Sequence, residues 1–333
     1  MKLQLKSVIL AAGAAAMIGV MAPSAKAEKT VTMVYPFPDF LIFTKSCKAM
    51  AAAVNKAGAG VIKIDVKAYN SIGMFQQPGA VSKGVVDMVC TPAAFYARAL
   101  PENEAVSTSN SLPAAVRANG GMKILDDLHQ KHMNMKYLGW IDSGPNFRIY
   151  MKNPPKFGAD GMPDFSGVKM RDNPIYGAFL RAMKASTHSL KAPQVYSALA
   201  KGVVDAAAWA TIGLPGLKWD KFLRHAVEPD FYQTDIGIIM NLKTWKGLSP
   251  KAQKILQGTV IAWENSSRAA RLTEAAAERK KLIAEGMKFY MAPAGEKYTE
   301  LAVNSAYARM EGRLGKMGRT LEWAKKLRQA YQK

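Results

Sequence analysis

Arg171 has the clearest capacity for chemistry in this sequence. It ends the apolar segment 168–171 and is followed by Asp172, Asn173 and Pro174. A guanidinium at that place offers a planar, two-point match to a carboxylate. Ligands of open parallel sheets bind beyond the carboxyl ends of the strands, where this side chain is expected to lie. We therefore predict that Arg171 and its neighbour Asn173 bind an organic acid; the alternative is that Arg171 forms a structural salt bridge.

Four further residues follow strand-like segments or lie near an expected crossing of the chain. Phe37, Thr91 and Trp209 each come directly after an apolar, strand-like run. The indole of Trp209 can stack on a flat or apolar ligand, or it can simply pack in the core. Arg148 can supply a second positive group or can lie on the surface. These four residues complete the set of candidate ligand-binding residues.

Enzymatic and metal-binding patterns are absent from the sequence. It contains no nucleophile elbow, no Walker loop, no zinc-type Cys-x-x-Cys and no Gly-x-Gly-x-x-Gly after a strand. His129 and His132 are three residues apart on a charge-rich helix, whereas His188 and His225 stand alone. We therefore predict a binding protein with no catalytic residues, no metal and no cofactor.

Alternating strands and helices must position these residues. The segments 31–35 and 61–66 are apolar and strand-like, and a helix capped by Asp39 is expected between them. A second helix ends at Gly84, before a strand at 85–90. This order of strand, helix, strand, helix and strand indicates a mostly parallel sheet.

The second half of the chain repeats this pattern. The pentapeptide Lys-Gly-Val-Val-Asp at 83–87 recurs at 201–205, each copy after a helical segment. A strand at 168–171 and helices at 174–184 and 193–201 are expected before the second copy. The repetition predicts two α/β lobes with a cleft between them, as does a length beyond what one core usually supports.

A long helix is expected to brace the two lobes. The stretch 250–290 has no proline after its first residue and favours helix throughout, although Gly258 or the segment 265–267 can break it. About forty helical residues would span roughly 60 Å, more than one lobe. Residues 298–332 are expected to add further helix. The predicted division assigns 28–145 with 237–270 to the first lobe, and 146–236 with 271–333 to the second.

The N-terminus has the order of a secretory signal. Lys2 precedes an apolar run at 8–21, and an Ala-Lys-Ala triplet ends at Ala27, directly before Glu28. Cleavage after Ala27 is expected, and the apolar run is too short to cross a bilayer. We therefore predict a soluble protein of the periplasm.

The composition is strongly basic. The 46 Lys and Arg residues outnumber 25 Asp and Glu residues, which gives a formal charge of +21. Removal of residues 1–27, with three lysines and no acid, leaves a charge of +18. The positive electrostatic field of such a protein enriches anionic solutes near its surface. The alternative is that the basic residues form a solvated surface with no role in binding. Nucleic acid is not an expected partner, because the chain has no recognition motif and no basic run interleaved with aromatic residues.

The chain has two cysteines, Cys47 and Cys90. An exported protein can oxidise such a pair. Because Cys47 lies on the apolar side of an expected helix and Cys90 lies in a strand-like run, we predict two buried thiols rather than a disulfide.

Three segments resemble motifs of the solute-binding subunit of tripartite ATP-independent periplasmic (TRAP) transporters, the DctP type. Residues 165–171 look like the family segment Asp-Leu-x-Gly-x-Lys-x-Arg, and 194–205 are similar to Glu-Val-Tyr-x-Ala-Leu-x-x-Gly-x-Val-Asp. Residues 241–250 match the Asn, Trp and Leu-Ser-Pro positions ahead of the family's brace helix. The resemblance implies a hinged two-lobe periplasmic binding protein in which Arg171 clamps the substrate carboxylate. It also implies small and large membrane subunits, driven by an ion gradient, as partners.

The sequence departs from the family pattern at several places. Ala206 stands where the family has glycine, and Gln194 stands where it has glutamate. Ala208 replaces a polar or acidic residue that members binding a cation tend to use, which puts a metal in doubt. Arg148 matches a second basic position found in many members.

The expected ligand is a small organic acid anion. Small side chains at Ala192 and 206–208, with Phe37 and Trp209 as flat walls, favour an aromatic or apolar carboxylate. A short hydroxy acid, keto acid or sulfonate is the rival. A periplasmic enzyme, a ligand-sensing protein and a binding protein of an ATP-driven importer are the alternative functions. A monomer is expected.

Overall fold

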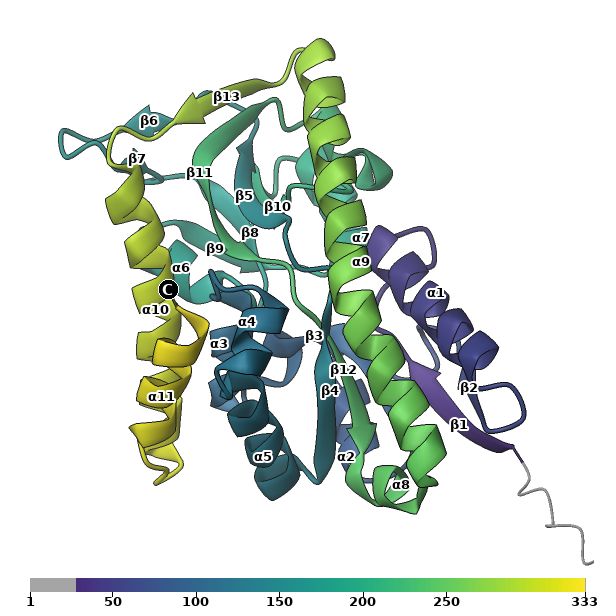
Figure 1. Ribbon diagram of the computed structural model, residues 1–333. Helices are drawn as coiled ribbons and strands as arrows, with labels where there is room; N and C mark the ends of the chain where they lie inside the picture. Colours follow the sequence, from purple (N-terminus) through teal and green to yellow (C-terminus); the bar gives the residue numbers. More distant parts are fainter. Residues whose placement is uncertain (1–27, 333) are drawn as a thin grey trace, which may run out of the picture.

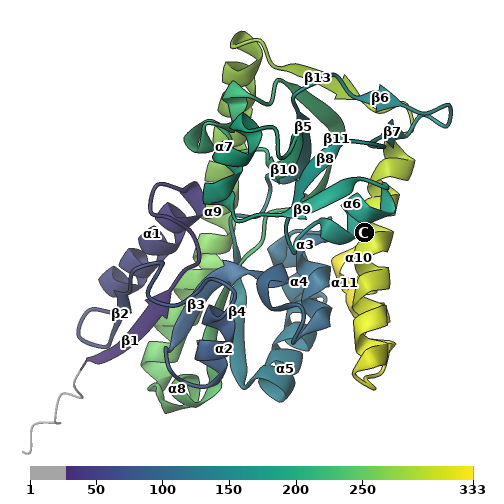
Figure 2. The ribbon, with the colours of Figure 1, turned by 180° about the vertical axis from the view of Figure 1, so that it is seen from behind.

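The computed structural model describes residues 28–332, which form two α/β lobes (Figures 1 and 2). The predicted signal segment, 1–27, lies outside the described residues. In 28–332 no helix is both long and apolar enough to span a bilayer.

The first lobe is built on a five-stranded sheet in the order β2-β1-β3-β12-β4. β1 pairs in parallel with β2 and β3, whereas β12 runs antiparallel to both β3 and β4. The sheet is therefore mostly parallel, as predicted, with one reversed strand that arrives from the second lobe. Its strands are β1 (Lys29–Val34), β2 (Ile62–Val66), β3 (Met88–Pro92), β4 (Met135–Ile141) and β12 (Ile236–Asn241).

The second lobe is built on a six-stranded sheet in the order β13-β11-β5-β10-β8-β9. β8 is parallel to β9 and β10, while β5 runs antiparallel to β10 and β11. Its strands are β5 (Asn146–Met151), β8 (Lys169–Asp172), β9 (Ser186–Ser189), β10 (Ala206–Ala210), β11 (His225–Gln233) and β13 (Lys288–Met291), and a small hairpin adds β6 (Lys156–Phe157) and β7 (Pro163–Asp164).

Helices cover both sheets and connect the lobes (Figures 1 and 2). They are α1 (Ile42–Ala57), α2 (Gln77–Ser82), α3 (Glu104–Ser107), α4 (Pro113–Ala118), α5 (Gly121–Met133), α6 (Gly177–Ala182), α7 (Ala192–Ala200), α8 (Leu242–Gly247), α9 (Pro250–Ala284), α10 (Gly295–Lys316) and α11 (Glu322–Tyr331). Short 3-10 turns add η1 (Ala93–Tyr96), η2 (Pro101–Asn103), η3 (Pro215–Leu217) and η4 (Trp219–Lys221).

The repeated pentapeptide has the same structural role in both lobes. Lys83 and Lys201 are the C-terminal caps of α2 and α7. The glycine after each lysine has a left-handed backbone, with φ of 75° at Gly84 and 69° at Gly202. Glycine adopts this conformation without steric cost, so each copy ends a helix and returns the chain toward the next strand.

α9 braces the two lobes. Ser249 caps its first turn by accepting a hydrogen bond from the amide of Ala252, and the helix continues unbroken through Gly258 for 35 residues. In the first lobe Glu264 accepts from the amide of Trp140 at 3.2 Å. In the second lobe Glu278 accepts from the amide of Gly213 at 2.7 Å. The helix ends at Ala284, earlier than the predicted limit at 290, and β13 follows.

Cys47 and Cys90 form a disulfide, so the prediction of two separate thiols is wrong. Their Cα atoms are 6.1 Å apart, within the range that a disulfide can bridge. The side chain of Cys47 lies on the buried face of α1, and α1 packs beside the sheet at the level of Cys90 on β3. Both residues are buried, but the packing of helix on sheet brings them together, and sequence spacing does not encode that packing.

Two other expectations are corrected by the fold. Asp39 does not cap α1, whose N-cap is Leu41; instead Asp39 accepts a hydrogen bond from the hydroxyl of Tyr35. The range 271–333 was expected to belong wholly to the second lobe, but α11 packs against the first. The ring of Tyr331 stacks on Trp140 of β4, with ring centroids 5.8 Å apart.

Candidate functional site

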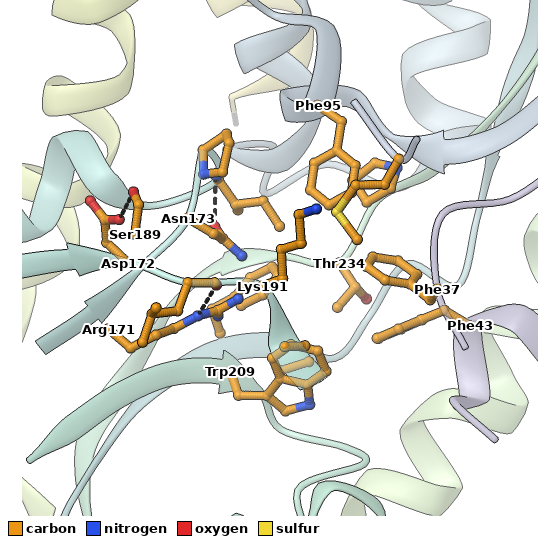
Figure 3. A pocket seen from close by; sticks show the side chains of 18 of the residues that line it. Phe37, Phe43, Phe95, Arg171, Asp172, Asn173, Ser189, Lys191, Trp209 and Thr234 are labelled. Atoms are coloured by element: carbon orange, nitrogen blue, oxygen red, sulfur yellow. Dashed lines mark hydrogen bonds between the residues drawn. The ribbon is translucent and has the colours of Figure 1, made fainter. Parts of the chain in front are cut away.

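A cavity of about 280 Å³ lies between the lobes, at the ends of strands from both sheets (Figure 3). The first lobe contributes side chains after β1 and β3, and the second lobe contributes the ends of β8, β9 and β10. Most of the lining is apolar or aromatic: Phe37, Phe43, Met74, Phe75, Phe95, Phe147, Ile175, Leu190, Trp209 and Ile236. Four of the six predicted residues line it, namely Arg171, Asn173, Trp209 and Phe37.

Arg171 lies in this cavity although it is only 2% exposed. Its Nε donates to the carbonyl of Leu190 at 2.9 Å, and its Nη1 donates to the hydroxyl of Tyr176. These contacts involve uncharged acceptors, and Arg171 forms no ion pair with any carboxylate of residues 28–332. The carboxylate next in sequence, Asp172, accepts from Ser189 and pairs with Arg181 instead. Arg171 is therefore a buried cation without an anion.

Neighbouring groups hold the Arg171 guanidinium in a fixed orientation. Tyr176 donates its hydroxyl hydrogen to the carbonyl of Ala208 at 2.5 Å. Burial raises the pKa of Tyr176 to about 12, so its hydroxyl stays neutral. The guanidinium also lies 5.6 Å from the ring centroid of Trp219 and 5.9 Å from that of Trp209. The aromatic faces stabilise the charge without consuming its hydrogen-bonding capacity.

Aromatic side chains from both lobes form the walls of the cavity. Phe37 packs edge-on against Phe95, with ring centroids 5.6 Å apart. Trp209 enters from the second lobe, packs against Trp219 and has a buried Nε1 with no hydrogen-bond partner in residues 28–332. In Figure 3, Arg171 and the pair Phe37 and Phe43 lie on opposite sides of the cavity. The arrangement suits a flat solute with a charged group at one edge.

Lys191 is a second cation that sequence analysis missed. It precedes α7 and lines the cavity, and Figure 3 shows its side chain extending into the cavity beside Asn173. Its Nζ forms no ion pair or hydrogen bond within residues 28–332. Gln194, the residue that replaces the family's glutamate, accepts from the amide of Lys191 at 3.0 Å. Glutamine keeps this helix-capping acceptor without adding a negative charge beside Lys191. The sequence feature that could have indicated Lys191 as a cavity residue is its place just before a predicted helix that follows a strand.

Asp235 is a second polar group that sequence analysis missed. It lies between β11 and β12, where the chain crosses between lobes, and it lines the cavity. One carboxyl oxygen accepts from the amide of Ala93 at 3.0 Å, while the other is buried without a partner in residues 28–332. Burial raises the pKa of Asp235 well above its ordinary value. A neutral carboxyl can donate a hydrogen bond as well as accept one. Its place at a predicted lobe crossing was the only signal.

The structure does not bring Arg148 or Thr91 into the cavity lining. Arg148 is on β5 and forms a bidentate pair with Asp230 of β11, at 2.5 and 2.9 Å, and a further pair with Glu228 at 2.9 Å. Its charge is thus already neutralised. Thr91 is fully buried within β3, one residue before Pro92, which does line the cavity.

Histidine and carboxylate side chains do not cluster as metal ligands in the part of the chain that the structure describes. His129 is buried, and its ring nitrogens contact the hydroxyl of Tyr96 at 2.8 Å and the carbonyl of Leu125 at 2.7 Å. Burial lowers the pKa of His129 to about 4. His129 is therefore a neutral residue of the core, although the helix that carries it is rich in charged residues.

The fold of this protein is similar to that of several solute-binding proteins of known structure. A TRAP solute-binding protein from Desulfovibrio salexigens with bound orotic acid has a TM-score of 0.76 at 18% identity, covering 91% of this chain and 98% of that one. One from Bordetella bronchiseptica, with calcium and picolinate, has a TM-score of 0.75 at 20% identity, covering 91% and 93%. A Bordetella pertussis receptor binding pyroglutamic acid has a TM-score of 0.73 at 17% identity, covering 91% and 99%. At these identities the likeness establishes the two-lobe fold.

The family assignment comes from the sequence itself. The sequence model of the DctP family, described as bacterial extracellular solute-binding protein, family 7, matches residues 38–312. This range contains every residue of the cavity except Phe37. The chain belongs to the DctP family of bacterial extracellular solute-binding proteins.

Proposed function

We propose that this protein captures a small aromatic or apolar carboxylate in the periplasm and delivers it to the small and large membrane subunits of a TRAP transporter. Arg171 binds the carboxylate, and the aromatic walls enclose the body of the solute. The protein performs no chemistry on the solute.

The observation that carries this proposal is the unpaired charge of Arg171. A buried cation without an anion costs free energy, because protein dipoles replace its hydration only in part. An incoming carboxylate supplies the missing anion, and the Nη2 of Arg171, which makes no hydrogen bond within residues 28–332, remains free to donate to it. Binding energy is therefore concentrated at this group.

The walls favour an aromatic or apolar solute over a short hydroxy acid. Phe37, Phe95 and Trp209 offer flat surfaces, whereas the polar groups are few. Each Å² of apolar surface removed from water contributes roughly 25 cal/mol, so an aromatic ring gains more here than a hydroxylated chain does. Three structurally similar proteins are described with pyroglutamic acid, picolinate and orotic acid, all planar or ring-shaped acids.

Lys191 and Asp235 supply the polar recognition beyond Arg171. Lys191 can pair with a second negative or electron-rich group on the solute. The unpartnered oxygen of Asp235 matches a hydroxyl or N–H at the far end of the ring. A ring acid with one such donor would pair with both Arg171 and Asp235.

A melting screen of the purified mature protein tests the proposal. The panel pairs each aromatic carboxylate with its uncharged primary amide, and it includes short hydroxy acids, keto acids and sulfonates at the same ionic strength. A solute at 100 times its dissociation constant adds about 2.7 kcal/mol to the stability, which raises the melting temperature by several degrees. We expect an aromatic carboxylate to give the largest shift and its amide to give none.

Three outcomes would count against the proposal. Equal shifts with the amide would remove the role of the arginine, and shifts confined to short hydroxy acids would remove the aromatic preference. Conversion of the solute over hours of incubation would replace binding by catalysis. Solution scattering supplies a further check, since closure of the lobes around a bound solute must reduce the radius of gyration.

A further inference from the structure

A second cavity, of about 510 Å³, adjoins the first. The two share a wall formed by Phe75, Phe95, Asp172, Asn173, Pro174 and Ser189. Beyond this wall the character of the lining changes from aromatic to cationic. Four arginines line the second cavity: Arg98, Arg181, Arg309 and Arg313.

Within residues 28–332 the four arginines have only two acidic partners. Glu104 pairs with both Arg309 and Arg313, the latter at 2.9 Å. Asp172 pairs with Arg181 at 3.4 Å. Arg98 forms no ion pair within residues 28–332. Four positive charges against two negative charges leave an excess of two.

Two further observations indicate that this excess charge is not balanced locally. The Nε of Arg309 is buried and has no hydrogen-bond partner in the described chain. Burial lowers the pKa of Arg313, and the charges of Arg309, Arg98 and Arg181 lower it further, against the opposing effect of Glu104. The guanidiniums are thus close enough to repel one another, and an anion between them would relieve that repulsion.

The arginines come from both lobes. Arg98 follows η1 in the first lobe, whereas Arg181 is the penultimate residue of α6 in the second. Arg309 and Arg313 are one turn apart on α10, which packs against α3 of the first lobe and against α6 and β11 of the second. A ligand that contacts Arg98 and Arg181 together therefore spans the gap between the lobes.

We propose that this second cavity is a binding site for a small oxyanion with about two negative charges, of the phosphate or sulfate class. The bound oxyanion links Arg98 of the first lobe to Arg181 of the second, and it holds the lobes together beside the solute cavity. The site is distinct from the one that contains Arg171, and it does not depend on the solute proposed above.

Inorganic phosphate is the probe for this site. The melting temperature of the parent protein is measured against phosphate concentration at constant ionic strength, with chloride as the balancing anion. We expect a saturable rise with phosphate and sulfate. A rise that stays linear, or one that chloride reproduces, would reflect general screening and would overturn the proposal.

Matched variants locate the site. Arg98→Gln removes a guanidinium that has no ion pair, so the protein should fold normally and bind phosphate at least tenfold more weakly. Lys63→Gln changes the net charge equally on an exposed residue of β2, the edge strand of the first sheet, and should bind like the parent. Equal weakening in both variants would make the effect one of net charge, and no weakening in Arg98→Gln would place phosphate elsewhere.

A third variant separates the two cavities. Arg171→Ala should keep the parent response to phosphate, because Arg171 does not line the second cavity. Loss of the response in this variant, with Arg98→Gln unaffected, would assign phosphate to the solute cavity. Solution scattering then tests the link between lobes: phosphate alone should reduce the radius of gyration of the parent but not of Arg98→Gln. Saturable binding without compaction would refute the link.

Discussion

Arg148 on β5 and Arg171 on β8 lie on either side of β10. Arg148 is paired with two carboxylates, whereas Arg171 is paired with no carboxylate of residues 28–332. Both guanidiniums are nearly inaccessible to solvent, with exposed fractions of 6% and 2%. A buried cation with its own anions stabilises the fold, and one without them is available to a ligand. The two arginines should therefore respond to substitution in opposite ways.

Substitution of Arg171 should weaken solute binding strongly without harming the ligand-free fold. Arg171→Ala leaves the bound carboxylate desolvated and unpaired, a loss on the order of 2 to 5 kcal/mol, or roughly thirty-fold to several thousand-fold in affinity. Arg171→Lys restores the charge but not the planar fork, so it should recover only part of the loss. Titration calorimetry with the best solute of the screen measures both. Parent affinity in Arg171→Ala, together with early melting, would make the residue structural.

Substitution of Arg148 should have the reverse effect. Arg148→Ala leaves Asp230 and Glu228 without their shared partner, which should cost about 3 kcal/mol of folding stability in denaturant titration. Solute affinity of the folded fraction should stay within about threefold of the parent. Arg148→Ala combined with Asp230→Asn is the control, since removing one stranded charge should restore part of the stability. A loss of affinity with unchanged stability would return Arg148 to the ligand site.

The disulfide should contribute substantially to stability. Cys47 and Cys90 are 43 residues apart, and closing a loop of that length in the unfolded chain corresponds to about 4 kcal/mol in the loop-entropy model. The variant Cys47→Ala with Cys90→Ala should lose a stability of that order while still binding the solute. Guanidinium titration of the parent in the presence and absence of reductant provides the comparison. An unchanged midpoint would mean that the bridge adds nothing.

The ionisation of Asp142 should lower the folding stability as the pH rises from about 4 to above 7. The lowered pKa of His129 acts in the opposite direction between about pH 4 and 6.5. Burial raises the pKa of Asp142 from 3.8 to about 7, against the hydrogen bond from Ser46. The folded state therefore binds the proton more tightly than the unfolded state does, and that advantage, on the order of 4 kcal/mol, is lost through this pH range. Burial likewise raises the pKa of Glu264 to about 7.

Asp142→Asn tests this pH dependence. Its amide keeps an acceptor for Ser46 and does not titrate, so the variant should be more stable than the parent at pH 8 and should show a flatter stability profile between pH 4 and 7. The remaining slope reflects the other buried groups, among them Glu264, whose raised pKa acts in the same direction, and His129, whose lowered pKa acts in the opposite direction. A profile identical to that of the parent would exclude Asp142 as the titrating group.

Chelation should leave solute affinity unchanged. Ala208 provides no carboxylate at the place where an acid was expected in cation-binding members, and residues 28–332 contain no cluster of three metal-ligating side chains. Solute affinity is measured before and after treatment with a strong chelator, and again after calcium has been added back. A tenfold loss that calcium reverses would indicate a cation held jointly by the solute and Asp235.

The order of elements and the place of Arg171 in the cavity lining were predictable from sequence because both depend on local patterns. Apolar, strand-like runs located β1, β2 and β8, and a proline-free stretch of helix-favouring residues located α9. The glycine after each repeated lysine marked the ends of α2 and α7. Arg171 was predictable because a residue at the end of a strand is placed by that strand alone. These features need no knowledge of what packs against them.

Other features depended on contacts between segments far apart in the chain, and only the tertiary structure decided them. The disulfide forms because α1 packs over β3. The charge of Arg148 is neutralised because Asp230, 82 residues later in the chain, lies within hydrogen-bonding distance of it. Lys191 and Asp235 enter the cavity because the lobes meet there, and α11 returns to the first lobe because Tyr331 stacks on Trp140. A charged side chain in a sequence carries no sign of whether a partner will neutralise it, since burial and pairing are set by the fold.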